Sequence, residues 1–142
     1  MRKRVVVYVI ALLLTVGSVA SATTQDFGFW FRKVNEKNQS AAAKKDDSEA
    51  RAYVTGQNIV MDPTSGSVYV GFRVRSSAGT AATDYKVFSV QGGGAPSVGG
   101  RNTLNYYSGM ANAGSWYTLN GQYDDASTDT TNSWSIGGRW TP

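Results

Sequence analysis

The feature that most constrains the fold is an alternating segment near the middle of the chain, Ser67–Arg75 (SVYVGFRVR). Every second residue in it is apolar and either β-branched or aromatic: Val68, Val70, Phe72 and Val74. The residues between them form the opposite face: Tyr69, Gly71, Arg73 and Arg75. A period of two with this composition predicts a half-buried antiparallel strand. The other strands of the chain must then assemble against the apolar face.

Six further segments carry strand patterns separated by turn residues: 26–34, 51–61, 84–91, 103–107, 115–123 and 133–140. The first has alternating phenylalanines that we expect to face inward, Phe27, Phe29 and Phe31. In the second the alternation slips at Gly56, which predicts a β-bulge. Pro63 and Gly66 then occupy turn positions, which favours a hairpin between the second segment and Ser67–Arg75.

The later segments show the same kind of inner face. We expect the alternate residues Tyr117, Leu119 and Tyr123 to face inward in one strand. In the last strand we expect Trp134, Ile136 and Trp140 to do so. The segment 84–91 has apolar residues on both faces, which indicates an interior strand or a change of twist. With no strong helical period, the chain predicts an all-β fold: an antiparallel β-sandwich, or a flattened barrel, of about seven short strands in a single domain over 23–142.

The first 22 residues show the three-part pattern of a secretory signal peptide. A basic head precedes the uncharged run 5–16 (VVVYVIALLLTV), and small residues follow, with Ala20 and Ala22 at the −3 and −1 positions. A membrane anchor is the alternative, but a spanning helix needs about 20 apolar residues. We therefore predict an N-terminal signal helix, cleavage after Ala22, and a secreted chain that begins at Thr23 and does not span a membrane.

Cleavage would change the charge of the protein. The whole chain has 14 basic and 10 acidic residues, a net charge of +4, and three of the basic residues lie in the signal. The mature chain would carry 11 minus 10, or +1. This weak charge argues against non-specific nucleic-acid binding and against a cationic membrane-disrupting peptide.

Two segments between strands are expected to be loops. Residues 35–50 (NEKNQSAAAKKDDSEA) have almost no large apolar side chains, which predicts a mobile polar loop or a marginal short helix, with the charge run 44–47 solvated. Residues 92–100 (GGGAPSVGG) form the second, a flexible glycine-rich loop. No Gly-Lys-Ser/Thr follows these glycines and no helix begins there, so they do not indicate a phosphate-binding loop.

The chain has no His and no Cys, which excludes histidine-based triads, a cysteine nucleophile and a His-bound zinc. Carboxylates remain, and three of them share one loop: Asp124, Asp125 and Asp129. Their oxygens could ligate calcium, although the spacing is not that of an EF-hand and a solvated turn is favoured. Their spacing does not supply the paired acids of a glycosidase. We predict no enzyme activity and no cofactor.

Aromatic residues on polar faces provide the sharper hypothesis. Trp116 shares its strand face with Asn120 and Gln122, and Tyr69 shares its face with Arg73 and Arg75. Flat rings beside amides and guanidinium groups can stack on a sugar or anchor a protein partner. A plainer interpretation is that the rings belong to the core or are covered by a second sheet. Gly71 could likewise simply make room for a ring across the strand.

Four stretches carry a family resemblance: DFGFWF after the signal, GSVYVGFRVR, GGRNTLNYYSGMANAGSWYTLNGQYDD, and SWSIGGRWTP at the end. Together they resemble a family of small secreted Gram-positive β-sandwich proteins defined only as a domain of unknown function. In general plan the chain is also similar to lactococcin-type bacteriocins, small β-sandwiches exported with a signal peptide. The resemblance implies a role against neighbouring cells or at their wall, and no catalytic residue transfers from either group.

These observations lead to three functional hypotheses. The first is a secreted, non-enzymatic protein that binds a cell-wall or membrane-protein target at a cell envelope, in the manner of a bacteriocin. The second is a carbohydrate-binding module that uses Trp116 and the amides beside it. The third and least favoured is a wall hydrolase that uses Asp124 or Asp125.

Overall fold

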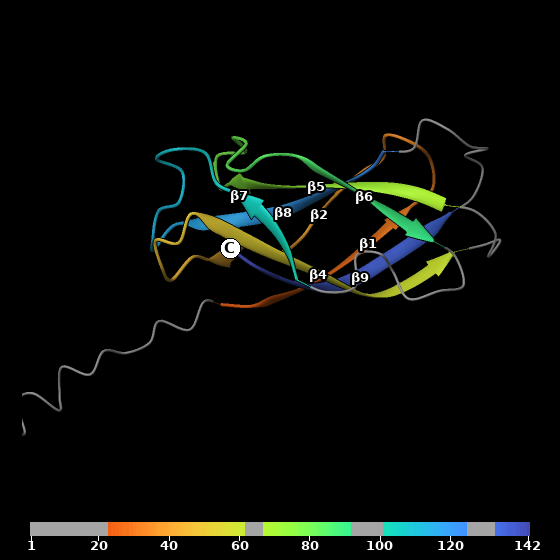
Figure 1. The fold of residues 1–142 in the computed structure, drawn as a ribbon, viewed down its shortest axis with the longest axis horizontal. Coiled ribbons are helices and arrows are strands. Elements are labelled where there is room, and N and C mark those ends of the chain that lie inside the picture. Colours follow the sequence, from red (N-terminus) through yellow and green to blue (C-terminus); the bar gives the residue numbers. More distant parts are fainter. Residues whose placement is uncertain (1–22, 62–66, 92–100, 125–132) are drawn as a thin grey trace, which may run out of the picture.

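The computed structural model describes residues 23–61, 67–91, 101–124 and 133–142, and within them it is built entirely from strands and loops (Figure 1). The described strands are β1 (Gln25–Phe31), β2 (Lys37–Gln39), β3 (Ala43–Lys44), β4 (Arg51–Met61), β5 (Ser67–Ser76), β6 (Lys86–Gln91), β7 (Asn102–Asn105), β8 (Trp116–Tyr123) and β9 (Trp134–Thr141). The predicted all-β antiparallel sandwich is confirmed, with nine described strands in place of about seven.

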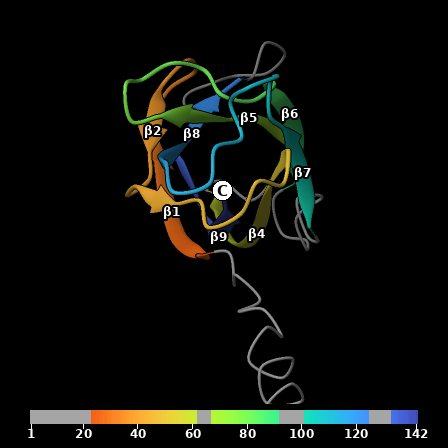
Figure 2. The same cartoon turned by 90° about the vertical axis from the view of Figure 1, so that its left-hand side faces the viewer.

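The strands form two antiparallel sheets that face each other across the core. One has four strands in the order β1-β9-β4-β7, and the other has the order β2-β8-β5-β6 with β3 also paired to β8. The sheets approach each other at both edges. The Asn38 side-chain amide donates to the Trp30 carbonyl oxygen at 2.9 Å on one side, and Thr83 and Tyr106 form a backbone bridge on the other. Viewed end-on, the strands therefore enclose the core as in a flattened barrel (Figure 2).

Aromatic side chains fill the space between the sheets, as the alternating patterns predict. The inner faces of β1, β5, β8 and β9 are all buried. The ring centroids of Phe27 and Phe72, from opposite sheets, lie 5.8 Å apart, and those of Phe31 and Tyr123, also from opposite sheets, lie 6.1 Å apart. Each such aromatic pair contributes about 0.5–1.5 kcal/mol beyond the area that it buries. In a chain without disulfides, these contacts hold the two sheets together.

The predicted bulge is confirmed, but the predicted hairpin is wrong. The β4–β9 register shifts between Gly56 and Asn58. However, β4 pairs with β7 and β9 whereas β5 pairs with β6 and β8, so the two lie in different sheets. Turn residues indicate that a chain reverses; they do not say whether the next strand joins the same sheet or the facing one. Both strands offer an apolar face, and each packs against the core from its own side.

The strand predicted in 84–91 is an edge strand, because β6 is the last in its sheet and pairs only with β5. An interior position is therefore wrong. Val90 faces the core and is fully buried, whereas Val87 is 46% exposed. Apolar residues on both faces here reflect one inward face and one exposed apolar side chain.

The polar segment 35–50 is not a loop or a helix throughout, because it contains β2 and β3, both paired with β8. Its charge run is not fully solvated either. Lys45 is 0% exposed, and its ammonium donates to Asp47 Oδ1 at 2.9 Å and to the Pro142 carbonyl oxygen at 3.0 Å. It also lies 5.0 Å from the centroid of the Tyr106 ring. A buried charge persists when hydrogen-bond acceptors surround it, and low hydrophobicity alone could not reveal those acceptors.

The same contacts alter the acidity of Asp47. Burial alone would raise its pKa, but the hydrogen bond from Lys45, the Glu49 backbone N–H and the Lys45 charge together hold the pKa below its ordinary value of 3.8. The ionised carboxylate is therefore the form that the fold favours.

The predicted signal peptide, with Ala20 and Ala22 at its cleavage site, lies outside the described residues. Within the described part of the chain, no helix has the length and apolar character needed to cross a bilayer.

Candidate functional site

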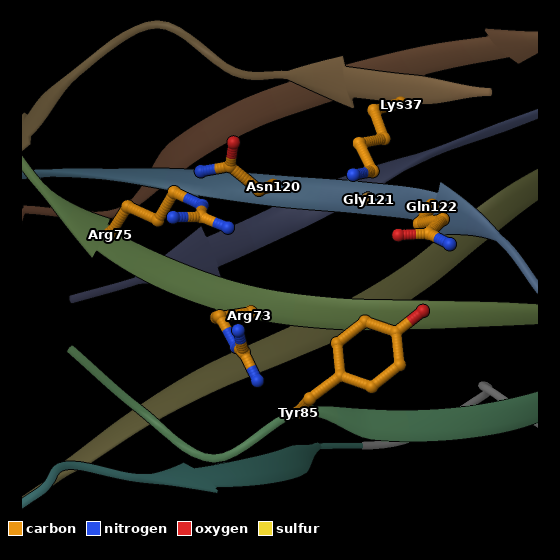
Figure 3. Close-up of a pocket in the computed structure, with 7 residues that line it drawn as sticks. All are labelled: Lys37, Arg73, Arg75, Tyr85, Asn120, Gly121 and Gln122. Atoms are coloured by element: carbon orange, nitrogen blue, oxygen red, sulfur yellow. The ribbon is translucent and has the colours of Figure 1, made fainter. Parts of the chain in front are cut away.

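A shallow pocket of about 210 Å³ opens on the outer face of the five-stranded sheet (Figure 3). Side chains from three strands and one preceding segment line it: Lys37 from β2, Asn120, Gly121 and Gln122 from β8, Arg73 and Arg75 from β5, and Tyr85 from just before β6. The pocket therefore gathers residues from four parts of the chain, between Lys37 and Gln122.

The strand register explains why these side chains meet. Arg73 is paired with Asn120, and Gln122 is paired with Gly71 on one side and with Lys37 on the other. Paired residues of neighbouring antiparallel strands project from the same face of a sheet, about 4.5–5.5 Å apart at Cβ. The alternation that buries Val70, Phe72 and Val74 thus points Arg73 and Arg75 outward, beside the amides of β8.

Gly71 makes room for a ring at one end of the pocket, as one interpretation of the sequence predicts. A Cβ atom built on Gly71 would lie 2.5 Å from Tyr85 Cε2 and closer still to its hydroxyl end. The Tyr85 ring lies in this gap, and its hydroxyl donates to Asp124 Oδ2 at 3.2 Å. The Arg73 guanidinium in turn lies 5.3 Å from the centroid of the Tyr85 ring, a cation–π distance.

This environment changes the acidity of Tyr85. Burial, followed by the nearby negative charge of Asp124 and the hydrogen bond to it, raises the pKa of Tyr85 from 10.0 to about 12, against a smaller opposing effect of Arg73. The phenol therefore stays protonated near neutral pH and remains a hydrogen-bond donor. In the pocket, the Tyr85 ring packs beside the Arg73 guanidinium and helps to hold it in place.

The pocket is cationic. Lys37, Arg73 and Arg75 line it, and no carboxylate is among the described residues that line it. Within the described part of the chain, the ion pairs are Lys45–Asp47 and Arg139–Asp26, so none involves a pocket cation. Arg75 Nη1 donates to the Gly79 carbonyl oxygen at 2.7 Å, in a turn where Gly79 has a φ of 81°. These side chains can therefore donate further hydrogen bonds to an anionic ligand.

The structure brings together four of the six residues predicted to bind a ligand: Arg73, Arg75, Asn120 and Gln122. Trp116 and Tyr69 do not line the pocket. Trp116 lies at the start of β8, is 52% exposed, and pairs with Lys44 of β3. Tyr69 pairs with Ser89 and lies beyond Gly71 on β5. Sharing a strand face was thus insufficient to place these two rings with the amides and guanidinium groups.

Sequence reasoning missed Lys37, Tyr85 and Gly121. Lys37 belongs to the segment predicted as a loop, so nothing placed it beside β8. Tyr85 was counted as a strand residue, although Gly71 signalled that a ring could cross β5. Gly121 contributes backbone, because its missing side chain leaves space on the inner face for the Phe29 ring.

The predicted acidic loop is only partly described. Asp124 accepts the hydrogen bond from Tyr85, while Asp125 and Asp129 lie outside the described residues. Among the described residues, no group of three or more His, Cys, Asp or Glu side chains is arranged to hold a metal ion. Calcium binding therefore stays a prediction, as does a hydrolase that uses Asp124 or Asp125.

Comparisons with known proteins add no relative, since the chain matches no protein-family model, no curated protein sequence and no solved structure. The family resemblance of the sequence therefore stays a prediction.

Proposed function

We propose that the protein is exported and acts without catalysis, by binding to a cell envelope through the outer face of its five-stranded sheet. The observation that carries the proposal is the pocket itself: three cations without carboxylate partners among the described residues, beside two amides and a fixed ring. Charged groups that lack partners within a protein are suited to complementary groups on a target. The absence of His and Cys from the sequence supports a binding role over a catalytic one.

The binding step is tested by incubating the purified, fluorescently labelled protein with intact cells and with isolated wall material. A variant carrying Arg73→Gln and Arg75→Gln should lose most of the bound signal. Arg139→Gln is the matched control, because Arg139 is an exposed arginine on the other sheet, paired with Asp26 at 3.3 Å. Absence of binding to any cell or wall preparation, or equal binding by the double variant, would contradict the proposal.

Export and antagonism have their own readouts. Mass spectrometry of protein recovered from the culture medium should give a chain that begins at Thr23, and an intact Met1 would contradict cleavage. Inhibition of related strains by the protein would support a bacteriocin-like role. Binding without inhibition would favour an adhesive or structural one.

Carbohydrate binding is the second candidate, and the exposure of Trp116 favours it. More than half of this large apolar side chain is accessible, on the same outer sheet face as the pocket. Exposed indole rings provide flat apolar surfaces for the faces of sugar rings. A glycan array should show signal that Trp116→Ala removes and Trp30→Ala, at an exposed indole of the other sheet, preserves. An array without signal would eliminate this candidate.

A further inference from the structure

We infer that the pocket formed by Lys37, Arg73, Arg75, Asn120 and Gln122 binds a phosphate group carried on a cell-surface polymer. This inference rests on the proposed envelope-binding function and names the chemical class of its ligand.

Charge complementarity is the first argument. Three cationic side chains line the pocket, Lys37 from β2 and Arg73 and Arg75 from β5, and no acid is among the described residues that line it (Figure 3). Asp124 accepts a hydrogen bond from the Tyr85 hydroxyl and is not among the described lining residues. Arginine guanidinium groups match the oxygens of phosphate in a two-point geometry, and lysine adds a mobile point charge. The pocket therefore has the composition of an oxyanion site.

The hydrogen-bonding state of the lining is the second argument. The Asn120 amide donates to Thr118 Oγ1 at 3.1 Å and to the Thr118 carbonyl oxygen at 3.3 Å, and the Gln122 amide donates to Asn35 Oδ1 at 3.2 Å. An NH₂ group has two protons, so Asn120 is held in place by both of its protons, whereas Gln122 is held by one and can donate again. The Arg73 Nε is buried without a hydrogen-bond partner in the described structure, and Arg73 is held against the Tyr85 ring. The Gln122 amide and the Arg73 guanidinium are therefore held in position, and side chains fixed in this way lose less entropy when an anion binds.

The shape of the ligand distinguishes a phosphate within a polymer from a carboxylate. Both groups carry one charge on two oxygens, but a carboxylate is planar and has a single substituent. A phosphodiester is tetrahedral and directs its two substituents away from the charged oxygens. Because the pocket is shallow and open to solvent, both substituents can continue along the sheet surface. A phosphate within a polymer chain therefore fits better than an enclosed metabolite.

The number of cations argues against a membrane surface. Recognition of anionic lipid surfaces typically uses clusters of about 4–8 Lys or Arg side chains. The pocket has three cations, grouped around one depression and not spread over a plane. A single phosphate-sized site on a polymer is the occupant that this arrangement favours.

The test measures binding of the purified protein to poly(glycerol phosphate) by isothermal titration calorimetry over a range of salt concentrations. We expect salt-dependent binding that inorganic phosphate weakens by competition. Arg73→Gln or Arg75→Gln should each weaken binding about 10-fold or more, the effect of losing one charge-assisted hydrogen bond. Lys37→Gln should reduce the slope of log K against log salt concentration by nearly 1. The reason is that each cation that contacts phosphate releases about one counterion on binding.

Controls separate charge from folding. Arg139→Gln removes a positive charge from the other sheet and should leave affinity within 2-fold, about the scatter expected for a charge outside the site. Arg73→Lys keeps the charge but loses the two-point geometry, so it should bind with intermediate affinity. The urea midpoint of each variant is measured as well. A variant whose midpoint matches that of the wild type is folded, so its loss of binding reports on the pocket and not on unfolding.

Several outcomes would overturn the inference. Equal affinity for poly-glutamate would refute the choice of phosphate over carboxylate. Binding to phosphatidylglycerol vesicles or to single-stranded DNA in preference to the polymer would refute the wall-polymer source. If cells and wall bind the protein while poly(glycerol phosphate) does not, envelope binding stands and the phosphate site falls. If neither binds, both proposals fall.

Discussion

Replacing Gly71 with Ala should displace the Tyr85 ring and thereby disturb the pocket. A Cβ at this position would lie 2.5 Å from Tyr85 Cε2 and overlap the hydroxyl end of the ring. The ring is the outer end of a partly exposed side chain, so it can rotate away while β5 keeps its place. The displaced ring would lose its hydrogen bond to Asp124 and its contact with Arg73.

The magnitude follows from these two losses and one gain. A hydrogen bond to a charged group contributes about 1.5–3 kcal/mol, and partial exposure of Tyr85 places it at the lower end. A cation–π contact at an exposed site adds about 0.5–1 kcal/mol. Alanine regains about 0.5–1 kcal/mol over glycine in a strand. We therefore expect Gly71→Ala to reduce the free energy of unfolding by about 1–2 kcal/mol.

Two measurements check this prediction. Urea denaturation followed by tryptophan fluorescence gives the stability change. Tyrosine absorbance during an alkaline titration should show that the pKa of Tyr85 falls from about 12 toward 10, and Tyr85→Phe identifies which titration step is lost. Gly28→Ala is the matched control, because a Cβ on this strand glycine has no neighbouring atom within 4 Å. If Gly71→Ala keeps the stability and the high tyrosine pKa, the ring does not occupy the gap as described.

Three other predictions test the fold. Gly138→Ala should destabilise the protein by about 3 kcal/mol, at the upper end for overpacking. The reason is that its Cβ would overlap the backbone carbonyl of Thr55, which cannot rotate aside. A urea midpoint near the wild-type value would contradict this. The lowered pKa of Asp47 adds stability above pH 3.8 that is lost as the pH falls through its folded value, so Asp47→Asn should flatten acid unfolding in that range. Fluorescence that resists acrylamide quenching should remain when the exposed Trp30 and Trp116 are both changed to Phe, since the other two indoles are buried.

The sequence was most informative where a property depends on neighbouring residues. Alternation correctly assigned the inner faces of β1, β5, β8 and β9, because side-chain direction in a strand follows directly from parity. The bulge at Gly56 was also predictable, since one extra residue shifts the apolar pattern. These features require no knowledge of which strands are neighbours.

Properties that depend on strand partners could not be obtained in this way. The β4 and β5 strands are consecutive but lie in different sheets, and β2 pairs with β8 despite its polar composition. Lys45 is buried by groups at Asp47 and Pro142, and the latter is 97 residues away in sequence. The same limit explains the site. Alternation along each strand places Arg73 and Asn120 on outer faces. Only the pairing between strands shows that they lie near Lys37 and that Trp116 does not.

The pocket and the core share a sheet but not their side chains, which leads to a last prediction. Gly121 faces inward, where a Cβ would lie 2.5 Å from Phe29 Cδ2, and its neighbours Asn120 and Gln122 face outward. The rim side chains of the pocket therefore contribute little to packing between the sheets. Lys37→Gln should change the free energy of unfolding by no more than about 0.5 kcal/mol, as for ordinary surface positions. Arg75→Gln should cost no more than about 1.5 kcal/mol, because it loses the hydrogen bond to the Gly79 carbonyl oxygen. Gly121→Ala should instead cost about 1–3 kcal/mol, because the buried Phe29 ring has no room to move. A large loss of stability from either rim variant would mean that the pocket is a structural feature of the sheet, and its loss of binding could not be assigned to a ligand.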